Sequence, residues 1–214
     1  MTATRTPSRT VTDGRATAGT TAPYLAIAAG LVGAVLALVQ LVLPPIVTSD
    51  WFSLPFTPTV ATIVAVVLAL QHAAIVPLMA LLPRIAAPST LGRIGGAVTS
   101  VGLVGLAVAE LVSITAMNEQ GDTAIVDAVN TGYAVPTILL GIGELLLGIA
   151  VIRAGRWRGW PRAVVLLAGI FVFVPLIPAL AVSGPFWAIA LALWSLLYLA
   201  IGVGALREGR GAAR

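Results

Sequence analysis

The chain alternates between long apolar segments and short polar ones, and this alternation predicts its secondary structure. Each apolar segment has about 20 residues or more, and at ~1.5 Å rise per residue a helix of that length crosses the ~30 Å hydrocarbon core of a bilayer. The predicted spans are residues 23–43, 58–82, 92–116, 133–153, 163–182 and 185–206. The pattern therefore predicts an all-α, polytopic transmembrane helix bundle with six spans.

The segments outside these spans are too short to form a separate domain. Residues 1–22 are rich in Thr, Ala and Arg, so we expect a disordered cytoplasmic tail before a transmembrane domain of residues 23–206. Residues 207–214 are expected to form a basic cytoplasmic tail. The first apolar run is too long for the core of a removable signal peptide, and Pro44 and Pro45 follow it instead of a small-residue cleavage site.

Charge is distributed unequally between the two sides of the predicted membrane. Three of the connections carry Asp50, Glu119, Asp122 and Asp127 and no basic residue. All basic residues lie on the other side, and they are Arg5, Arg9, Arg15, Arg84, Arg93, Arg153, Arg156, Arg158, Arg162, Arg207, Arg210 and Arg214. Because cytoplasmic loops carry the Lys/Arg excess, we expect both termini in the cytoplasm.

Composition supports a membrane protein and excludes several kinds of chemistry. The mean hydropathy is +1.05 and only 9% of residues are charged, against about 25% in average soluble chains. The net charge of +4 follows from the arginine bias, and no basic patch is interleaved with stacking aromatics, so we expect no nucleic-acid partner. Without Cys or Lys, thiol and Schiff-base chemistry are excluded. Arg in place of Lys, with abundant Ala, Val and Gly, suggests a GC-rich bacterium and hence a bacterial inner membrane.

Three ionisable side chains lie inside the predicted spans, where they are costly, so His72, Glu110 and Glu144 are the acid/base or proton-coupling candidates. Glu144 shares a helix face with Gly141 and Gly148, and small residues allow a neighbouring helix to approach closely. We therefore expect Glu144 to point into the bundle, roughly 16 Å below the outer surface. His72 could instead simply bond a neighbouring helix, and Glu144 could serve packing through one interhelical hydrogen bond, worth about 0.6–2 kcal/mol. Glu110 could instead reach the headgroup region.

The surroundings of the other two ionisable residues add substrate-binding candidates. Ser113 lies one turn beyond Glu110, and Gln71 stands beside His72. Pro77 removes an amide donor and clashes with the preceding turn, so we expect a kink directly after His72. A stripe of small residues on the third span also predicts close helix contact, and it comprises Gly95, Thr99, Gly102, Ala109 and Ser113.

Aromatic and acidic residues complete the set of candidates. Trp194 and Tyr198 lie one turn apart on the last span, where they could pack or form a wall for a lipophilic ligand. Pro175 and Pro178 predict a kink in the fifth span. The chain has no HxxxH or ExxH spacing, no P-loop and no dinucleotide fingerprint, so we expect neither a metal nor a cofactor.

The segment from Gly143 to Arg153, followed by the Arg- and Trp-containing turn 156–162, is similar to a pattern in known membrane proteins. It resembles small six-span integral membrane proteins of high-GC Gram-positive bacteria, in which a Gly-rich span ends in a basic cytoplasmic turn containing Trp and Pro. The resemblance covers about a fifth of the chain. It implies the topology, and no activity or catalytic residue is transferred from it.

Three functions are compatible with these features. The protein could handle a small or lipophilic substrate as a proton-coupled transporter or transport subunit, alone, as a homo-oligomer or with a partner subunit. It could be a membrane-embedded enzyme acting on an isoprenoid or lipid, with Glu144 as proton donor and Glu110 as acceptor. It could also be a structural or regulatory protein whose polar residues serve packing. Membrane lipids are expected contacts of its basic loops in every case.

Overall fold

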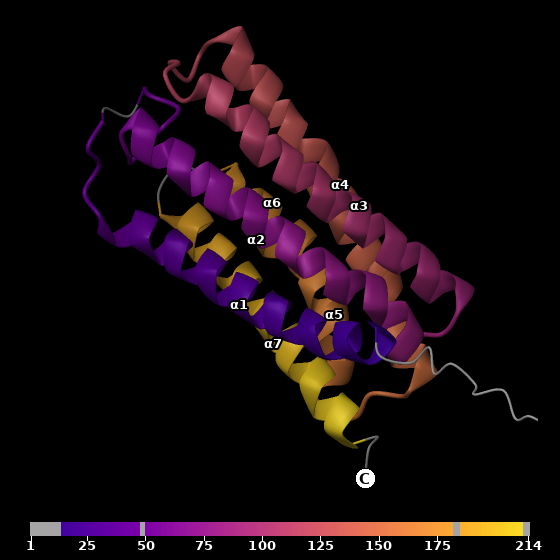
Figure 1. Cartoon of the computed structure of the whole chain (residues 1–214). Helices are drawn as coiled ribbons and strands as arrows, with labels where there is room; N and C mark the ends of the chain where they lie inside the picture. The colour runs from indigo at the N-terminus through magenta and orange to yellow at the C-terminus, as the bar shows by residue number, and fades with distance from the viewer. Residues whose placement is uncertain (1–13, 48–49, 182–184, 212–214) are drawn as a thin grey trace, which may run out of the picture.

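The computed structural model describes residues 14–47, 50–181 and 185–211, which fold as an all-α bundle (Figure 1). Five of its helices are α1 (Gly14–Val42), α2 (Pro58–Ile85), α3 (Thr90–Ser113), α4 (Ala124–Ala154) and α7 (Phe186–Gly211). A 3₁₀ turn, η1 (Ile114–Ala116), extends α3, and the fifth span is built from α5 (Pro161–Phe171), the π-helical turn η2 (Val172–Leu176) and α6 (Ile177–Leu180). The described residues thus contain six helical spans long and apolar enough to cross a membrane, as predicted.

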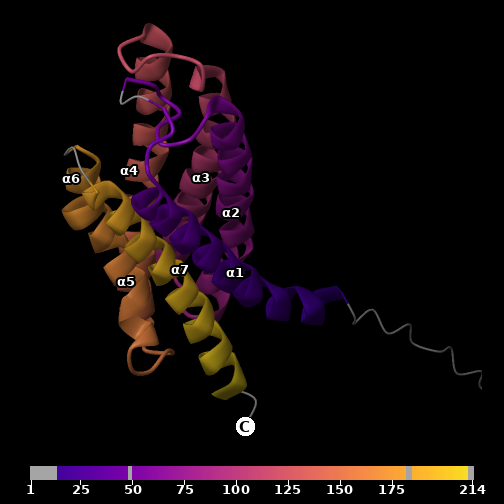
Figure 2. The same cartoon turned by 90° about the vertical axis from the view of Figure 1, so that its left-hand side faces the viewer.

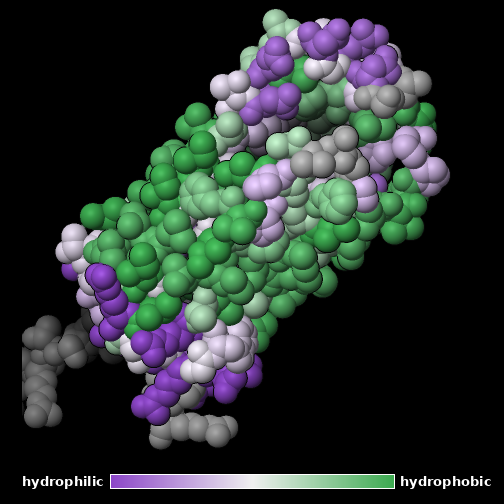
Figure 3. Space-filling model, turned by 180° about the vertical axis from the view of Figure 1, so that it is seen from behind, coloured by the Kyte–Doolittle hydropathy of each residue, from purple (hydrophilic) through white to green (hydrophobic). Residues whose placement is uncertain are grey.

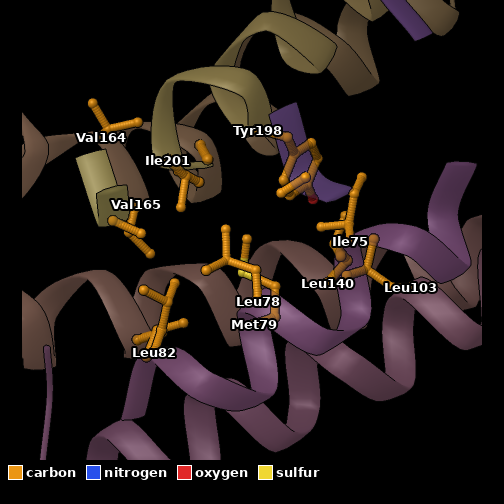
Figure 4. Close-up of a cluster of buried hydrophobic side chains, with 14 of the residues drawn as sticks. Ile75, Leu78, Met79, Leu82, Leu103, Leu140, Val164, Val165, Tyr198 and Ile201 are labelled. Carbon is orange, nitrogen blue, oxygen red and sulfur yellow. The ribbon is translucent and has the colours of Figure 1, made fainter. Parts of the chain in front are cut away.

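The six spans form a closed ring in chain order. Each of the helices α1 to α4 packs against the next one along the chain, and α7 packs against both α5 and α1 to close the ring. Figure 2 shows α1 crossing α7 at a slant to α2, α3 and α4. Buried side chains fill the interior, and Figure 4 shows Tyr198 of α7 directed toward Ile75, Leu103 and Leu140 on the facing helices.

The outer surface of the ring is apolar. Leu70 on α2 is 66% exposed and Val101 on α3 is 61% exposed, and many other large apolar side chains face outward. A hydrophobic band lies between two hydrophilic ends of the molecule (Figure 3). Soluble proteins rarely expose apolar surface on this scale, so the band is the surface expected to face lipid.

Small residues bring α4 into close contact with its neighbours, as their stripes predicted. A Cβ atom added to Gly102 of α3 would lie 2.7 Å from the backbone nitrogen of Leu140. One added to Gly95 would lie 2.5 Å from the backbone nitrogen of Leu147. On the other side of α4, Gly148 faces Leu166 of α5. The backbones approach at these positions because glycine has no Cβ.

The first and last helices extend beyond the predicted spans. α1 begins at Gly14, so residues 14–22 of the expected tail are helical. The remainder of that expected tail, residues 1–13, lies outside the described residues. α7 continues to Gly211, into the expected basic tail. The first extension contains alanine, the best helix former, and the second contains Arg207 and Glu208, which also favour helix, so a helix started by an apolar span can continue past it.

The fourth helix begins nine residues before the predicted span. It starts at Ala124 and takes up part of the acidic connection that we expected to be a loop. Thr123 has the extended conformation of an N-cap residue, and Asp127 lies in the first turn, where a carboxylate interacts favourably with the helix dipole. These local signals extend the helix beyond its apolar run.

The prolines have different effects in the second and fifth spans. α2 remains α-helical through Pro77, five residues after His72, so this proline does not interrupt the helix. In the fifth span, Pro175 lies within the π-helical turn η2, so the expected irregularity is present there. Proline lacks the amide hydrogen and clashes with the carbonyl four residues earlier, and a wider π turn relieves both problems.

The first and third connections are joined at one end of the ring. Trp51 and Gln120 form an isolated antiparallel bridge, and the Gly121 amide donates to the Asp50 carbonyl at 2.7 Å. This contact ties the α1–α2 connection to the α3–α4 connection, so the acidic end of the bundle is closed by paired loops.

Candidate functional site

Four of the predicted site residues meet inside the ring. His72 of α2, Glu144 of α4, and Trp194 and Tyr198 of α7 form what we term the inner polar cluster. The ring centroids of His72 and Trp194 are 6.2 Å apart, and those of Trp194 and Tyr198 are 5.0 Å apart in an edge-to-face arrangement. Tyr198 is close enough to Glu144 for the two side chains to interact.

The inner polar cluster is buried, and five of its side-chain polar atoms make no hydrogen bond to a described residue. Glu144 and Tyr198 are 0% exposed, while Trp194 is 4% and His72 is 5% exposed. Seven buried side-chain polar atoms among the described residues make no hydrogen bond, and five of them belong to this cluster. They are His72 Nδ1, Glu144 Oε1 and Oε2, Trp194 Nε1 and the Tyr198 hydroxyl. Glu144 and Tyr198 therefore face each other without completing a hydrogen bond of normal geometry.

Helix periodicity explains why these residues converge. Trp194 and Tyr198 are four residues apart, so they occupy one face of α7, the face that points into the ring. On α2, His72 lies on the face that also carries Ile75 and Met79, both fully buried. Glu144 lies on the face of α4 predicted from its small residues, and its complete burial confirms that it points inward.

Gln71 directly precedes His72 on α2, but its side chain belongs to a separate contact with α1 and α7. Its side-chain amide and the Ser195 hydroxyl both face Gly33 of α1, where an added Cβ would lie 2.8 Å from Gln71 Nε2 and 2.6 Å from Ser195 Oγ. Three helices therefore contribute to a second polar contact, one residue along the chain from His72 and from Trp194. The sequence singled out Gln71 but did not identify Ser195.

The remaining two predicted residues form a separate group nearer the acidic end. The Tyr133 hydroxyl donates a 2.8 Å hydrogen bond to Glu110 Oε2. The Ser113 hydroxyl donates to the Glu110 carbonyl at 2.7 Å and lies beside Tyr133. We term Glu110 and Tyr133 the outer pair. In contrast to Glu144, the Glu110 carboxyl group has a partner within the protein.

The inner polar cluster and the outer pair lie at different depths in the ring. Thr99 of α3 packs against Gly143, the residue that precedes Glu144. Glu110 follows Thr99 by eleven residues on the same span, which corresponds to about 16 Å along the helix axis. Direct proton transfer needs groups within hydrogen-bond reach or one water apart. Glu110 and Glu144 are therefore too far apart to act on one substrate atom.

Replacing Tyr133 with Phe should destabilise the protein through the outer pair. The change removes the hydrogen bond to Glu110 and leaves a carboxyl oxygen of a largely buried residue without its partner, which typically costs about 1–3 kcal/mol. At about 2–4 °C per kcal/mol, we expect the melting temperature in detergent to fall by about 2–12 °C. Tyr24→Phe is the control because Tyr24 is 53% exposed, and it should melt like the wild type. Equal melting temperatures for the two variants would contradict a stabilising outer pair.

Tyr133 of the outer pair was missed by sequence reasoning although a signal was present. The small-residue stripes of α3 and α4 set the register of an antiparallel pair, with Gly102 beside Leu140. Continued outward, that register places Tyr133 near Glu110. Thr99, which the sequence placed on the small-residue stripe, lies against Gly143 in the same register, and its buried Oγ1 makes no hydrogen bond within the described residues.

Within the described residues, no group of three or more His, Cys, Asp and Glu side chains could hold a metal ion. The inner polar cluster instead offers hydrogen-bonding groups of mixed character. Trp194 Nε1 is a donor, the Glu144 oxygens accept, and His72 Nδ1 and the Tyr198 hydroxyl can act in either sense. The cluster therefore presents both hydrogen-bond donors and acceptors.

Comparison with protein-family models, with curated proteins and with solved structures finds no match to this chain. The assignment of class therefore rests on the fold itself. Six helices long and apolar enough to span a bilayer, with large apolar side chains on the outside, are compatible with a multi-pass integral membrane protein.

Proposed function

We propose that this protein handles a small or lipophilic substrate inside its helix ring, by proton-coupled transport or as a transport subunit. We also propose that it resides in a bacterial inner membrane with both termini in the cytoplasm. The orientation is supported by the arginines, which gather at the end of the ring that carries the α2–α3 and α4–α5 connections.

The observation that carries the proposal is the set of unpaired polar atoms in the inner polar cluster. A buried polar group without a hydrogen bond typically costs about 1–3 kcal/mol, and native proteins contain few of them. Five such atoms on three helices are therefore better explained by binding than by packing. The rings of Trp194 and Tyr198 add an apolar wall, so the site suits a molecule with both polar and apolar parts.

Proton coupling is supported by the positions of the two carboxyl groups. Glu144 lies in the ring interior and Glu110 about 16 Å nearer the acidic end, and each faces a tyrosine hydroxyl. Carboxyl groups inside a membrane are characteristic of proton relays in transporters. We therefore assign Glu144 as the group that exchanges a proton when substrate binds. Glu110 is assigned as a second proton-carrying group, nearer the outer side of the membrane.

A membrane-embedded enzyme acting on an isoprenoid or lipid is the second candidate, and one observation favours it. Glu144 lies beside the edge-to-face pair of Trp194 and Tyr198, so an acid adjoins an aromatic wall that could shield a carbocation. In that reaction Glu110 would be too far from Glu144 to accept the proton, whereas His72 belongs to the same cluster. Turnover of a polyprenyl-type substrate in membranes without a pH gradient would identify the enzyme, whereas a transporter moves its substrate unchanged.

Native mass spectrometry of the detergent-purified protein, paired with solvent extraction, tests whether the ring interior binds a ligand. We expect a stoichiometric small or lipophilic compound in the wild type and its loss in Trp194→Ala, which removes the wall beside His72 and Tyr198. Trp160→Ala is the matched control, since Trp160 is 44% exposed near the start of α5. A protein that carries no such compound, or one that keeps it in Trp194→Ala, would point to a structural role for the cluster.

A further inference from the structure

Two neighbouring grooves lie at the end of the ring that carries the α2–α3 connection. The first has a volume of about 620 Å³ and lies between α2 and α3, with Arg84 on one side and Arg93 on the other. The second has a volume of about 470 Å³ and is bordered by Arg153 and Arg156 at the end of α4. Pro88 lines both grooves, so they adjoin each other.

The guanidinium groups of Arg84, Arg93, Arg153 and Arg156 at these grooves are exposed and have no acidic partner among the described residues. Within the described part of the chain, none of them makes a hydrogen bond or an ion pair. Glu208 is the one described carboxyl group in the polar segments at this end, and it accepts a hydrogen bond from the Arg158 amide at 3.2 Å. Four positive charges therefore surround the two grooves without an internal counter-ion, which is the electrostatic signature of an anion site.

The first groove continues from its arginines into the apolar band. Its lining includes Ala80, four residues before Arg84, and Ser100, seven residues after Arg93. These separations correspond to about 6 Å and about 10 Å along the helices toward the centre of the ring. Ala80 and Ala97 are small and exposed, so they leave a shallow apolar channel on the lipid-facing surface. A ligand here can place a charged group at the arginines and a hydrocarbon chain along the helices.

The start of α3 adds a further attraction for an anion. The helix begins at Thr90, and Ser89 caps it by accepting a 3.1 Å hydrogen bond from the Gly92 amide. The amino end of a helix carries a partial positive charge that favours phosphate groups. Pro88 and Ser89 line the second groove, so this helix end lies where the two grooves meet.

We propose that the two grooves together bind one anionic phospholipid with two phosphate groups, of the diphosphatidylglycerol class. One phosphate lies between Arg84 and Arg93, and the other lies against Arg153 and Arg156. The acyl chains follow the apolar walls of the grooves into the bilayer.

A lipid with one phosphate would neutralise one arginine pair only, and a zwitterionic lipid would add its own positive charge. A free phosphate ion would make no use of the apolar channel. This site is independent of the inner polar cluster.

The proposal is tested by lipid titration of the purified protein, followed by native mass spectrometry. The probes are diphosphatidylglycerol, phosphatidylglycerol, phosphatidylcholine and inorganic pyrophosphate. We expect one diphosphatidylglycerol molecule per chain, bound at least about tenfold more tightly than phosphatidylglycerol. A surface arginine contributes about fivefold to binding of an anionic lipid, so the double variant Arg84→Gln/Arg153→Gln should weaken binding about 30-fold.

The control is the double variant Arg207→Gln/Arg210→Gln, which removes the same charge from the same end of the ring but outside the grooves. It should bind diphosphatidylglycerol like the wild type. Ala97→Phe fills the first groove from an exposed position without a change in charge, and it should also weaken binding. Melting temperatures show that each variant is folded.

Three outcomes would overturn the proposal. Equal losses in the two double variants would mean that net charge alone attracts the lipid. Equal affinities for the lipids with one and two phosphates would exclude a shared site. Pyrophosphate that binds as tightly as the lipid would show that the apolar channel has no role. A compound bound to the inner polar cluster is distinguishable, because it is lost in Trp194→Ala and kept in the arginine variants.

Discussion

In membrane vesicles that hold a preset pH gradient, the Glu144→Gln variant should fail to dissipate the gradient when the compound recovered from the ring interior is added. The wild type should dissipate it, because Glu144 is the fully buried carboxyl group of the inner polar cluster and exchanges a proton as substrate binds. Glutamine has the same size and keeps an acceptor oxygen but cannot carry the proton. Since a positioned acid or base typically contributes 10²–10⁴-fold, we expect the rate to fall about 100-fold or more.

The matched control for this measurement lies on the same helix. Asp127→Asn neutralises an exposed carboxylate in the first turn of α4, outside the ring interior, and it should leave the rate unchanged. Tyr198→Phe keeps the carboxyl group and removes the hydroxyl that faces it, so an intermediate rate is expected. A fully active Glu144→Gln variant would remove the central residue of the transport proposal. Substrate turnover without a gradient would favour the enzyme instead.

The spans and the inward-facing residues could be predicted because both follow from local periodicity. An uninterrupted apolar run of about 20 residues has few alternatives to a membrane-spanning helix. A carboxyl group on a face of small residues has lower energy inside the bundle than in lipid, and Glu144 is fully buried as expected. The helix ends were less predictable, since Gly14 and Ala124 begin helices outside the apolar runs. Helix propensity and the charges of the first turn influence such ends, and hydropathy alone does not locate them.

The meeting of His72, Trp194 and Glu144 could not be predicted, because it depends on how three helices are arranged in space. Sequence spacing relates residues on one helix only. The contact between α1 and α7 closes the ring and joins the two ends of the chain, and it also determines which helix faces His72. For the same reason, the separation of Glu110 from Glu144 became clear only from the register of α3 against α4. That separation makes an acid and base pair of the two glutamates incompatible with the geometry.

Replacing Gly102 with Val should produce the largest loss of stability of any single change considered. Even the Cβ atom of alanine at this position would lie 2.7–2.8 Å from the backbone nitrogen, Cα and Cβ of Leu140, and these atoms cannot move unless α4 moves. Overpacking of a well-packed interior typically costs about 1–3 kcal/mol, and a clash with backbone belongs at the upper end of that range. At about 2–4 °C per kcal/mol, the melting temperature in detergent should fall by about 6–12 °C.

Gly132→Ala on α4 should raise the melting temperature, in contrast to Gly102→Val on α3. Gly132 lies within α4, and a Cβ atom added there would have no neighbour within 4 Å. Alanine is the better helix former by about 0.5–1 kcal/mol, so this variant should melt about 1–4 °C above the wild type. Opposite signs for two glycine substitutions would show that the contact of α3 with α4, and not glycine itself, determines stability. If Gly102→Val melts like the wild type, the two helices are not in close contact. The register that separates Glu110 from Glu144 would then lose its support.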